Sequence, residues 1–301
     1  MMKSLLIGSM VATAALTSSL VVPASPVYAQ ALNANLNITP RRIVLDARAR
    51  SATAFIFNQG TGPATFDVSM VDRVMNESGR IEPVERAAED NETGDWTGPL
   101  ENLAAAGDMI IAVPRRTTLQ PGAGQTIRLR VRSPGDGTPG EFRSHLTVIN
   151  VPSRDEGVSV EDAARAGEGE LGFSIQSLFG ISIPVIVRHG EIDVSAVIAE
   201  PTLEMRPRNN ADGTQTDTPT LVFELRRDGA HSLFGDVRIT GNNDELVGEI
   251  SSLGVYPEIP MRRVAVPLNR APMPGEQFQI QFIDDDAAPG AVRAEAVYTA
   301  G

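Results

Sequence analysis

The segment from Gly172 to Val187 constrains the fold more than any other part of the chain. Its odd-numbered positions are apolar with one exception, and they are Phe173, Ile175, Ser177, Phe179, Ile181, Ile183, Val185 and Val187. This two-residue repeat predicts a long β-strand with one hydrophobic face. Pro184 has no N–H for a ladder, so at least one side of the strand should face no permanent partner. Because a long hydrophobic edge promotes aggregation, its retention suggests that something binds it.

The N-terminus predicts export, and the overall charge limits the possible partners. Residues 1–29 have the pattern of a cleavable signal peptide, with Lys3, an apolar centre and a small-residue cleavage site ending at Ala29. The chain has a net charge of −12, and Lys3 is its only lysine. This acidic balance argues against nucleic acid and anionic lipid as partners, and the mature chain is not expected to insert into a membrane. The chain has no cysteine, so disulfides and thiolate chemistry are excluded.

Short strands separated by turns follow one another along most of the chain, which predicts an all-β fold. A first strand is expected from Ile38 to Leu45, and a polar loop from Asn209 to Pro219. Six strands are expected after Gly190, at Ile192–Ile198, Leu221–Leu225, Val237–Ile239, Val264–Leu268, Phe278–Phe282 and Ala294–Tyr298. Two successive sets of about seven strands predict two immunoglobulin-like β-sandwich domains, at 30–189 and 190–301.

Two polar insertions interrupt the first set of strands. Asn76 to Asp108 is acidic, contains the only tryptophan and shows no sustained period, so it is either a solvated insertion or a dedicated binding loop. Ser153 to Glu170 is a second polar insertion. On the strand between them, Arg128, Arg130 and Arg132 share one face, which is either an anion site or an exposed face that balances an acidic protein.

The chemistry of an enzyme is not visible in the sequence. No nucleophile elbow, metalloprotease motif, phosphate-binding loop or dinucleotide fingerprint occurs. His145, His189 and His231 lack metal-ligand spacing and are read as structural. Asp284 to Asp286 either ligates calcium or forms a charged turn, and the absence of spaced ligands favours the turn. We therefore expect no catalytic residue, no metal and no cofactor.

Several stretches together resemble the PapD-like periplasmic chaperones of the chaperone–usher pathway. In the first domain they are TPRRIVLDARARSATAFIFNQGTGPATF, PRRTTLQPGAGQTIRLR, GEFRSHLTVINVP and GISIPVIVR. The second domain resembles the family more weakly, through LVFELRRDGAHSLFGDVRI. The order and spacing of these stretches carry the resemblance, since no single one of them is specific.

The resemblance implies two immunoglobulin-like domains at an angle and a chaperone function in the periplasm. Such a chaperone donates an edge strand to a pilin-like subunit that lacks its last strand, and delivers the subunit to an outer-membrane usher. In this sequence the donated residues would be Phe173, Ile175, Ser177, Phe179 and Ile181. Ile183, Val185 and Val187 would serve the core of the chaperone itself. The alternative is a strand buried wholly within its own sandwich, for which the polar Ser177 counts slightly.

The resemblance also implies an anchor for the terminal carboxylate of the subunit. In the family an arginine on the first strand and a lysine on the seventh form this anchor. Arg42 matches the arginine, and Arg41 would replace it after a shift of one residue. Pro184 stands where the lysine would be, and Arg188 is the nearest arginine that could substitute for it.

Two other classes of function remain possible from the residues. One is a structural or adhesive sandwich protein that binds glycan or a surface protein through its acidic loops. The other is a hydrolase assembled from residues that are scattered in the sequence, which the absent motifs disfavour. Genes for an usher and a pilin next to this one would favour the chaperone, whereas genes for glycan processing would favour the surface module.

Overall fold

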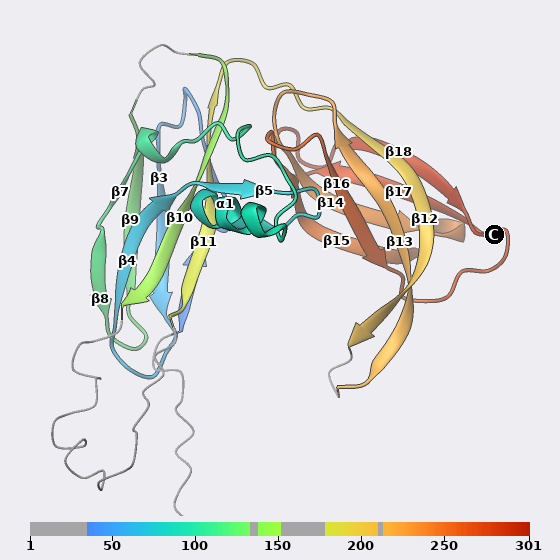
Figure 1. Cartoon of the computed structure of the whole chain (residues 1–301), viewed down its shortest axis with the longest axis horizontal. Helices are drawn as coiled ribbons and strands as arrows, with labels where there is room; N and C mark the ends of the chain where they lie inside the picture. The colour runs from blue at the N-terminus through green and yellow to red at the C-terminus, as the bar shows by residue number, and fades with distance from the viewer. Residues whose placement is uncertain (1–34, 133–137, 152–177, 210–212) are drawn as a thin grey trace, which may run out of the picture. The chain divides into compact units, whose positions relative to one another are not determined.

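The fold was analysed on a computed structural model of the chain, which describes residues 35–132, 138–151, 178–209 and 213–301. The predicted signal peptide, the insertion from Ser153 to Glu170 and the strand residues 172–177 lie outside these ranges. Leu32–Gly301 forms one compact unit. The predicted all-β architecture of two immunoglobulin-like sandwiches is confirmed, and the exact boundary between the domains stays a prediction (Figure 1).

The first sandwich consists of two sheets whose strands lie between Leu36 and His189. One sheet has the order β1 (Leu36–Thr39), β3 (Ser51–Asn58), β9 (Gly124–Val131) and β7 (Ile110–Val113). The other has the order β2 (Ile43–Leu45), β11 (Gly180–His189), β10 (Gly140–Val151), β4 (Ala64–Val71) and β8 (Arg116–Leu119). The alternating apolar residues of both sheets fill one core, which includes Ile56, Phe66 and Leu146.

The second sandwich is built in the same way from the strands after Ala196. One sheet has the order β12 (Ala196–Asn209), β13 (Gln215–Arg227) and β16 (Met261–Pro267). The other has the order β15 (Leu246–Val255), β14 (Leu233–Thr240), β17 (Gln277–Asp284) and β18 (Val292–Thr299). The predicted alternation on β17 is confirmed, because Phe278, Ile280 and Phe282 are fully buried in the core between these sheets.

Four strand predictions need correction. The strand expected at Ile192–Ile198 begins only at Ala196, as β12. Residues 38–45 form two strands, because β1 pairs with β3 whereas β2 pairs with β11 in the other sheet. The predicted loop Asn209–Pro219 is partly β13, since Asn209 to Met205 pair with Gln215 to Pro219 in a hairpin with few buried side chains. The prediction lacked β15, whose pairing with β14 shifts register twice and so interrupts the sequence alternation.

The acidic insertion is folded, although its sequence shows no sustained period. It contains β6 (Ile81–Pro83) and α1 (Val84–Thr93), and β6 pairs with β5 (Arg73–Met75), the strand just before the insertion. Short 3₁₀ turns occur at Gly107–Met109, where the insertion ends, and at Asn242–Asp244 between β14 and β15. The helix ends at Gly94, which has the left-handed conformation (φ 81°) that favours glycine. Val74, Ala87 and Trp96 form a small core of their own. Met75 of β5 belongs to the core of the second sandwich, and Ile81 of β6 packs against the same core, so the insertion contacts that sandwich.

Candidate functional site

The first half of β11 has a strand partner on one side only within the described residues. On that side the whole of β11 pairs with β10, from Gly180 opposite Ile149 to His189 opposite Gly140. On the other side β2 pairs in parallel with Val185 to Val187 alone. Among the residues that the structure describes, none pairs with Gly180 to Pro184 on that second side.

The direction of the backbone N–H and C=O groups shows which residues of β11 can hydrogen-bond on the side away from β10. The N–H of Asn150 donates to the carbonyl of Phe179 at 2.9 Å, so the backbone groups of Phe179 face β10. In an antiparallel ladder this direction alternates from one residue to the next. The backbone groups of Gly180 and Ser182 therefore point away from β10. Pro184 is the next residue in this series, and its missing N–H falls on the same outward side.

The side chains of the odd-numbered row become more exposed towards the start of β11. Val185 and Val187 are fully buried and Ile183 nearly so, all three in the core of the first sandwich, which confirms their prediction as core residues. Ile181 is partly buried against the same core, whereas Phe179 is 39% exposed. Of the predicted donor residues, Phe173, Ile175 and Ser177 lie outside the described ranges.

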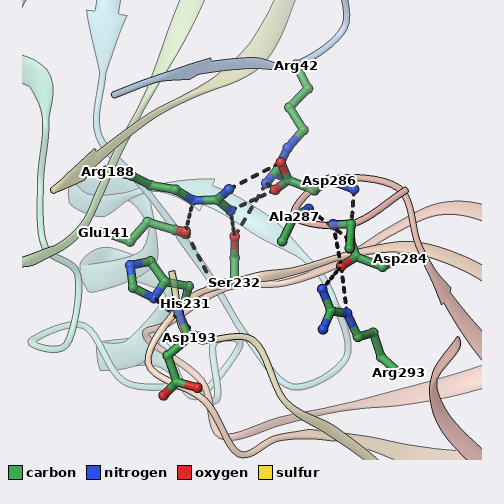
Figure 2. Close-up of polar contacts among 11 residues, drawn as sticks. Arg42, Glu141, Arg188, Asp193, His231, Ser232, Asp284, Asp286, Ala287 and Arg293 are labelled. Atoms are coloured by element: carbon green, nitrogen blue, oxygen red, sulfur yellow. Dashed lines mark hydrogen bonds and ion pairs between the residues drawn. The ribbon is translucent and has the colours of Figure 1, made fainter. Parts of the chain in front are cut away.

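Two of the three predicted anchor arginines converge on one carboxylate, Asp286, in the loop between β17 and β18 (Figure 2). Arg42 Nη2 lies 2.6 Å from Asp286 Oδ2. Arg188 holds both oxygens, with Nη1 3.2 Å from Oδ1 and Nη2 2.7 Å from Oδ2. Arg41 is exposed, and the ion pairs of this cluster within the described ranges are made by Arg42 and Arg188.

All three guanidinium nitrogens of Arg188 donate hydrogen bonds. Its Nε donates to Glu141 Oε2 at 2.8 Å, and its Nη2 also lies 3.3 Å from the hydroxyl of Ser232. The side chain is 3% exposed. Since each nitrogen has an acceptor, Arg188 is a buried connector between Glu141 at the start of β10 and Asp286.

Arg42 is bound less completely. Its Nη2 contacts Asp286 and the hydroxyl of Ser232, and its guanidinium lies over the ring of Phe234, 4.3 Å from the centroid. Its Nε and Nη1 are buried and have no hydrogen-bond partner among the described residues. A buried N–H without a partner costs free energy, so this edge of Arg42 suits an acceptor such as a carboxylate.

The loop that carries Asp286 is ordered by a neighbouring carboxylate. Asp284 accepts hydrogen bonds from the backbone N–H groups of Asp286, Ala287 and Ala288, at 2.8 to 3.1 Å. Its Oδ2 also binds Arg293 Nε at 2.8 Å. Of the two interpretations of this acidic triplet, the structure therefore supports the charged turn.

The charges in this cluster shift the pKa values of its members. Burial opposes the ionised form of Asp286, but the hydrogen bond from Arg188 and the charge of Arg42 outweigh it, and the pKa of this carboxyl is lowered. Burial likewise disfavours the charged form of Arg188, yet Asp286 and Glu141 raise its pKa overall. Both side chains therefore stay charged at neutral pH.

A second buried ion pair joins β10 to the loop after β15. The Nη2 of Arg143 donates to Glu258 Oε1, and the guanidinium also stacks on Tyr256, 3.8 Å from the ring centroid. The backbone N–H of Met75, at the end of β5, donates to the same Glu258 oxygen at 2.9 Å. His145 is buried beside this pair, and burial together with the charge of Arg143 lowers its pKa well below the usual value.

The three histidines have separate neighbours, as their sequence spacing suggests. His189 lies against Phe142, His145 beside Arg143, and His231 Nδ1 accepts the N–H of Asp193 at 3.0 Å. Within the described ranges no cluster of His, Asp and Glu could hold a metal ion. No helix in those ranges is long and apolar enough to cross a membrane.

Sequence reasoning missed the partners of the arginines. Asp286 was considered as part of an acidic turn, and Glu141, Ser232 and Phe234 carried no signal of their own. Arg188 lies 98 residues from Asp286 in the chain. Such a contact has no local pattern, although the excess of carboxylates made acidic partners for buried arginines a reasonable expectation.

Comparisons with known proteins gave matches to solved structures alone. No family model and no curated protein sequence matches the chain. The E. coli chaperone DraB matches 89% of this chain and 97% of its own, with 11% identity and a TM-score of 0.43. The Pseudomonas aeruginosa CupB2 chaperone matches 88% of this chain and 100% of its own, with 13% identity and a TM-score of 0.41.

A further match is a chain from the structure of Salmonella enterica SafA pilin in complex with the SafB chaperone. It covers 88% of this chain and 96% of its own, with 11% identity and a TM-score of 0.41. Each of these three matching structures is of a chaperone or contains one. At these scores they assign no role to any residue of this chain.

Proposed function

We propose that this chain is a periplasmic chaperone that binds pilus subunits by donating an edge strand and delivers them to an outer-membrane usher. The observation that supports this function best is the outer side of Gly180 to Pro184 on β11, with which no described strand pairs, next to the exposed Phe179. The proposal includes removal of residues 1–29 on export and a domain boundary between His189 and Gly190.

The edge would bind a subunit through its backbone and its side chains together. Gly180 and Ser182 present outward backbone groups, each of which can pair with an extended segment of the subunit at roughly 0.5–1.5 kcal/mol per hydrogen bond. Phe179, with Ile181 beside it, would fill pockets in the open core of the subunit. Burial of a phenylalanine side chain contributes about 1.5–3 kcal/mol. Phe173 and Ile175 would extend the same row.

The position of β2 suggests how a subunit strand would lie. Because β2 occupies the edge from Val185 onward, a subunit strand beside Gly180 to Pro184 must stop where β2 begins, next to Arg42. A strand whose C-terminus meets Arg42 would run in the same direction as β11. Its terminal carboxylate could then accept the two unpartnered N–H groups of Arg42. Arg188 would act indirectly, by holding Asp286 and Glu141 in place.

The proposal is tested by co-expression with a pilin-like subunit encoded beside this gene. We expect the wild-type chain to give a soluble complex on size-exclusion chromatography. Phe179→Asp should reduce the yield of complex by at least about tenfold, because a charge would enter the apolar pocket. Val297→Asp is the matched control, since Val297 is 62% exposed on β18 in the other sandwich and should leave the complex intact.

Capture that is unaffected by Phe179→Asp would contradict donation of this strand. The melting temperature of the variant must stay close to that of the wild type, which its exposed position predicts. If no subunit is captured, and the chain instead binds glycan or a surface protein with its acidic loops, the structural or adhesive alternative would be favoured.

A further inference from the structure

The anchor cluster is electrically balanced before any ligand arrives. Arg42 and Arg188 each carry one positive charge, and Asp286 and Glu141 each carry one negative charge. A ligand carboxylate that approaches Arg42 therefore meets no net attraction from these four groups. It also meets the carboxylate of Asp286 on the same guanidinium, where two like charges in a buried setting repel strongly.

We propose that Asp286 is a built-in competitor that shares Arg42 with the subunit carboxylate, so that the carboxylate binds the Nε and Nη1 edge of Arg42 only when its strand is held as well. This inference rests on the proposed function and deepens it. Its consequence is selectivity, because a small free carboxylate brings no strand contacts to offset the repulsion from Asp286. The chain would thus ignore soluble carboxylates and respond to a C-terminus that is attached to a β-strand.

Asp286 stays in place when a carboxylate binds Arg42, because other groups hold both it and its loop. Arg188 bonds both of its oxygens, at 3.2 and 2.7 Å. The backbone of residues 286–288 is held by Asp284, and Asp284 is held by Arg293. Asp286 contacts Arg42 through Nη2, which leaves Nε and Nη1 for a second carboxylate. That carboxylate would therefore bind close to the charge of Asp286.

Acetate is the probe that separates this competition from subunit binding. The full mature chain is labelled with ¹⁵N, and the arginine Nε–H signals are followed while sodium acetate is added at constant ionic strength with chloride. Arg42→Lys assigns the signal of Arg42. We expect a weak response in the wild type, and binding at least about tenfold tighter in Asp286→Asn, because a neighbouring negative charge is removed.

Asp285→Asn is the matched control, since it makes the same change of charge on an exposed neighbour in the same loop. It should bind acetate as weakly as the wild type. Equal acetate affinity in the wild type and Asp286→Asn, or an equal gain in Asp285→Asn, would overturn the inference. Asp286→Ser serves as a second variant if Asp286→Asn does not fold, because Asp284 still orders the loop.

The two proposals fail in different experiments. Loss of subunit capture by the wild-type chain would remove the proposed function and leave the acetate result unchanged. Subunit capture with no acetate response at Arg42 in Asp286→Asn would instead overturn the competitor and leave strand donation intact.

Discussion

Glu258 is the residue whose replacement should destabilise the chain most clearly. Its side chain is 1% exposed, and it accepts hydrogen bonds from Arg143, which is 2% exposed, and from the N–H of Met75. Glu258→Ala would leave the guanidinium of Arg143 buried without its counter-charge. Removal of one partner from a buried ion pair costs about 3–5 kcal/mol of unfolding free energy. The lost hydrogen bond from Met75 is part of that cost, because both bonds end on the same oxygen.

The ion pair itself should contribute much less than this loss. Burial raises the pKa of the Glu258 carboxyl more than the charge of Arg143 lowers it, so the charged pair pays heavily for its desolvation. The double variant Arg143→Met with Glu258→Leu should therefore recover at least about half of the stability that either single variant loses. Arg143→Met alone should destabilise by a similar amount to Glu258→Ala.

Urea unfolding followed by circular dichroism measures these differences. Glu200→Ala is the control, since Glu200 forms a surface pair with Arg226 and should change the unfolding free energy by less than about 1 kcal/mol. A loss below about 1 kcal/mol in Glu258→Ala would refute the reasoning. A double variant as unstable as the sum of the two single variants would refute the claim that the pair is nearly neutral.

Two further predictions concern the insertion and the buried histidine. Trp96→Ala should cost about 3–5 kcal/mol and speed hydrogen exchange within α1, because Trp96 fills the small core of the insertion; unchanged exchange in α1 would contradict that packing. The lowered pKa of His145 means that the unfolded chain, and not the folded one, takes up a proton near pH 6.5, so stability should fall as the pH drops below that value. His145→Gln should reduce this fall between pH 7 and pH 5 in urea titrations, and an identical pH profile would show that His145 is not its source.

The strand that the sequence singled out could be predicted because its signal is local. An apolar residue at every second position needs no knowledge of the rest of the chain, and Ile183, Val185 and Val187 are buried as the repeat predicts. The outward place of Pro184, in contrast, follows from the backbone bond between Asn150 and Phe179 and not from the sequence repeat. Like the repeat of β11, the alternation of β17 was sufficient to predict that strand. The two register shifts in the pairing of β15 interrupt its alternation, so the sequence did not predict β15.

The folded insertion could not be predicted in this way. Its small core combines Val74 from a strand, Ala87 from a helix and Trp96 from a loop, so no single period runs through it. Its attachment to the second sandwich depends on Met75 and on Glu258, which lie 183 residues apart in the chain. A high content of acids indicated solvent exposure, which holds for the outer face of α1, where Glu85, Glu89 and Glu92 are exposed. It gave no information about the inner face.

The geometry also distinguishes the two arginines that could replace a missing anchor lysine at position 184. Arg188 lies four residues further along β11, a distance of about 13 Å in an extended strand, and its fork is already bound to Glu141 and Asp286. Arg42 precedes Ile43, which pairs with Val185, so its backbone is about one strand spacing of 4.8 Å from Pro184. The planar guanidinium of Arg188 binds the carboxylates of Glu141 and Asp286 along separate edges. A lysine ammonium has no such planar arrangement of donors. Under the proposed function, we therefore infer that carboxylate binding falls to Arg42 and that Arg188 is the positioning residue, so that the two arginines have separate tasks.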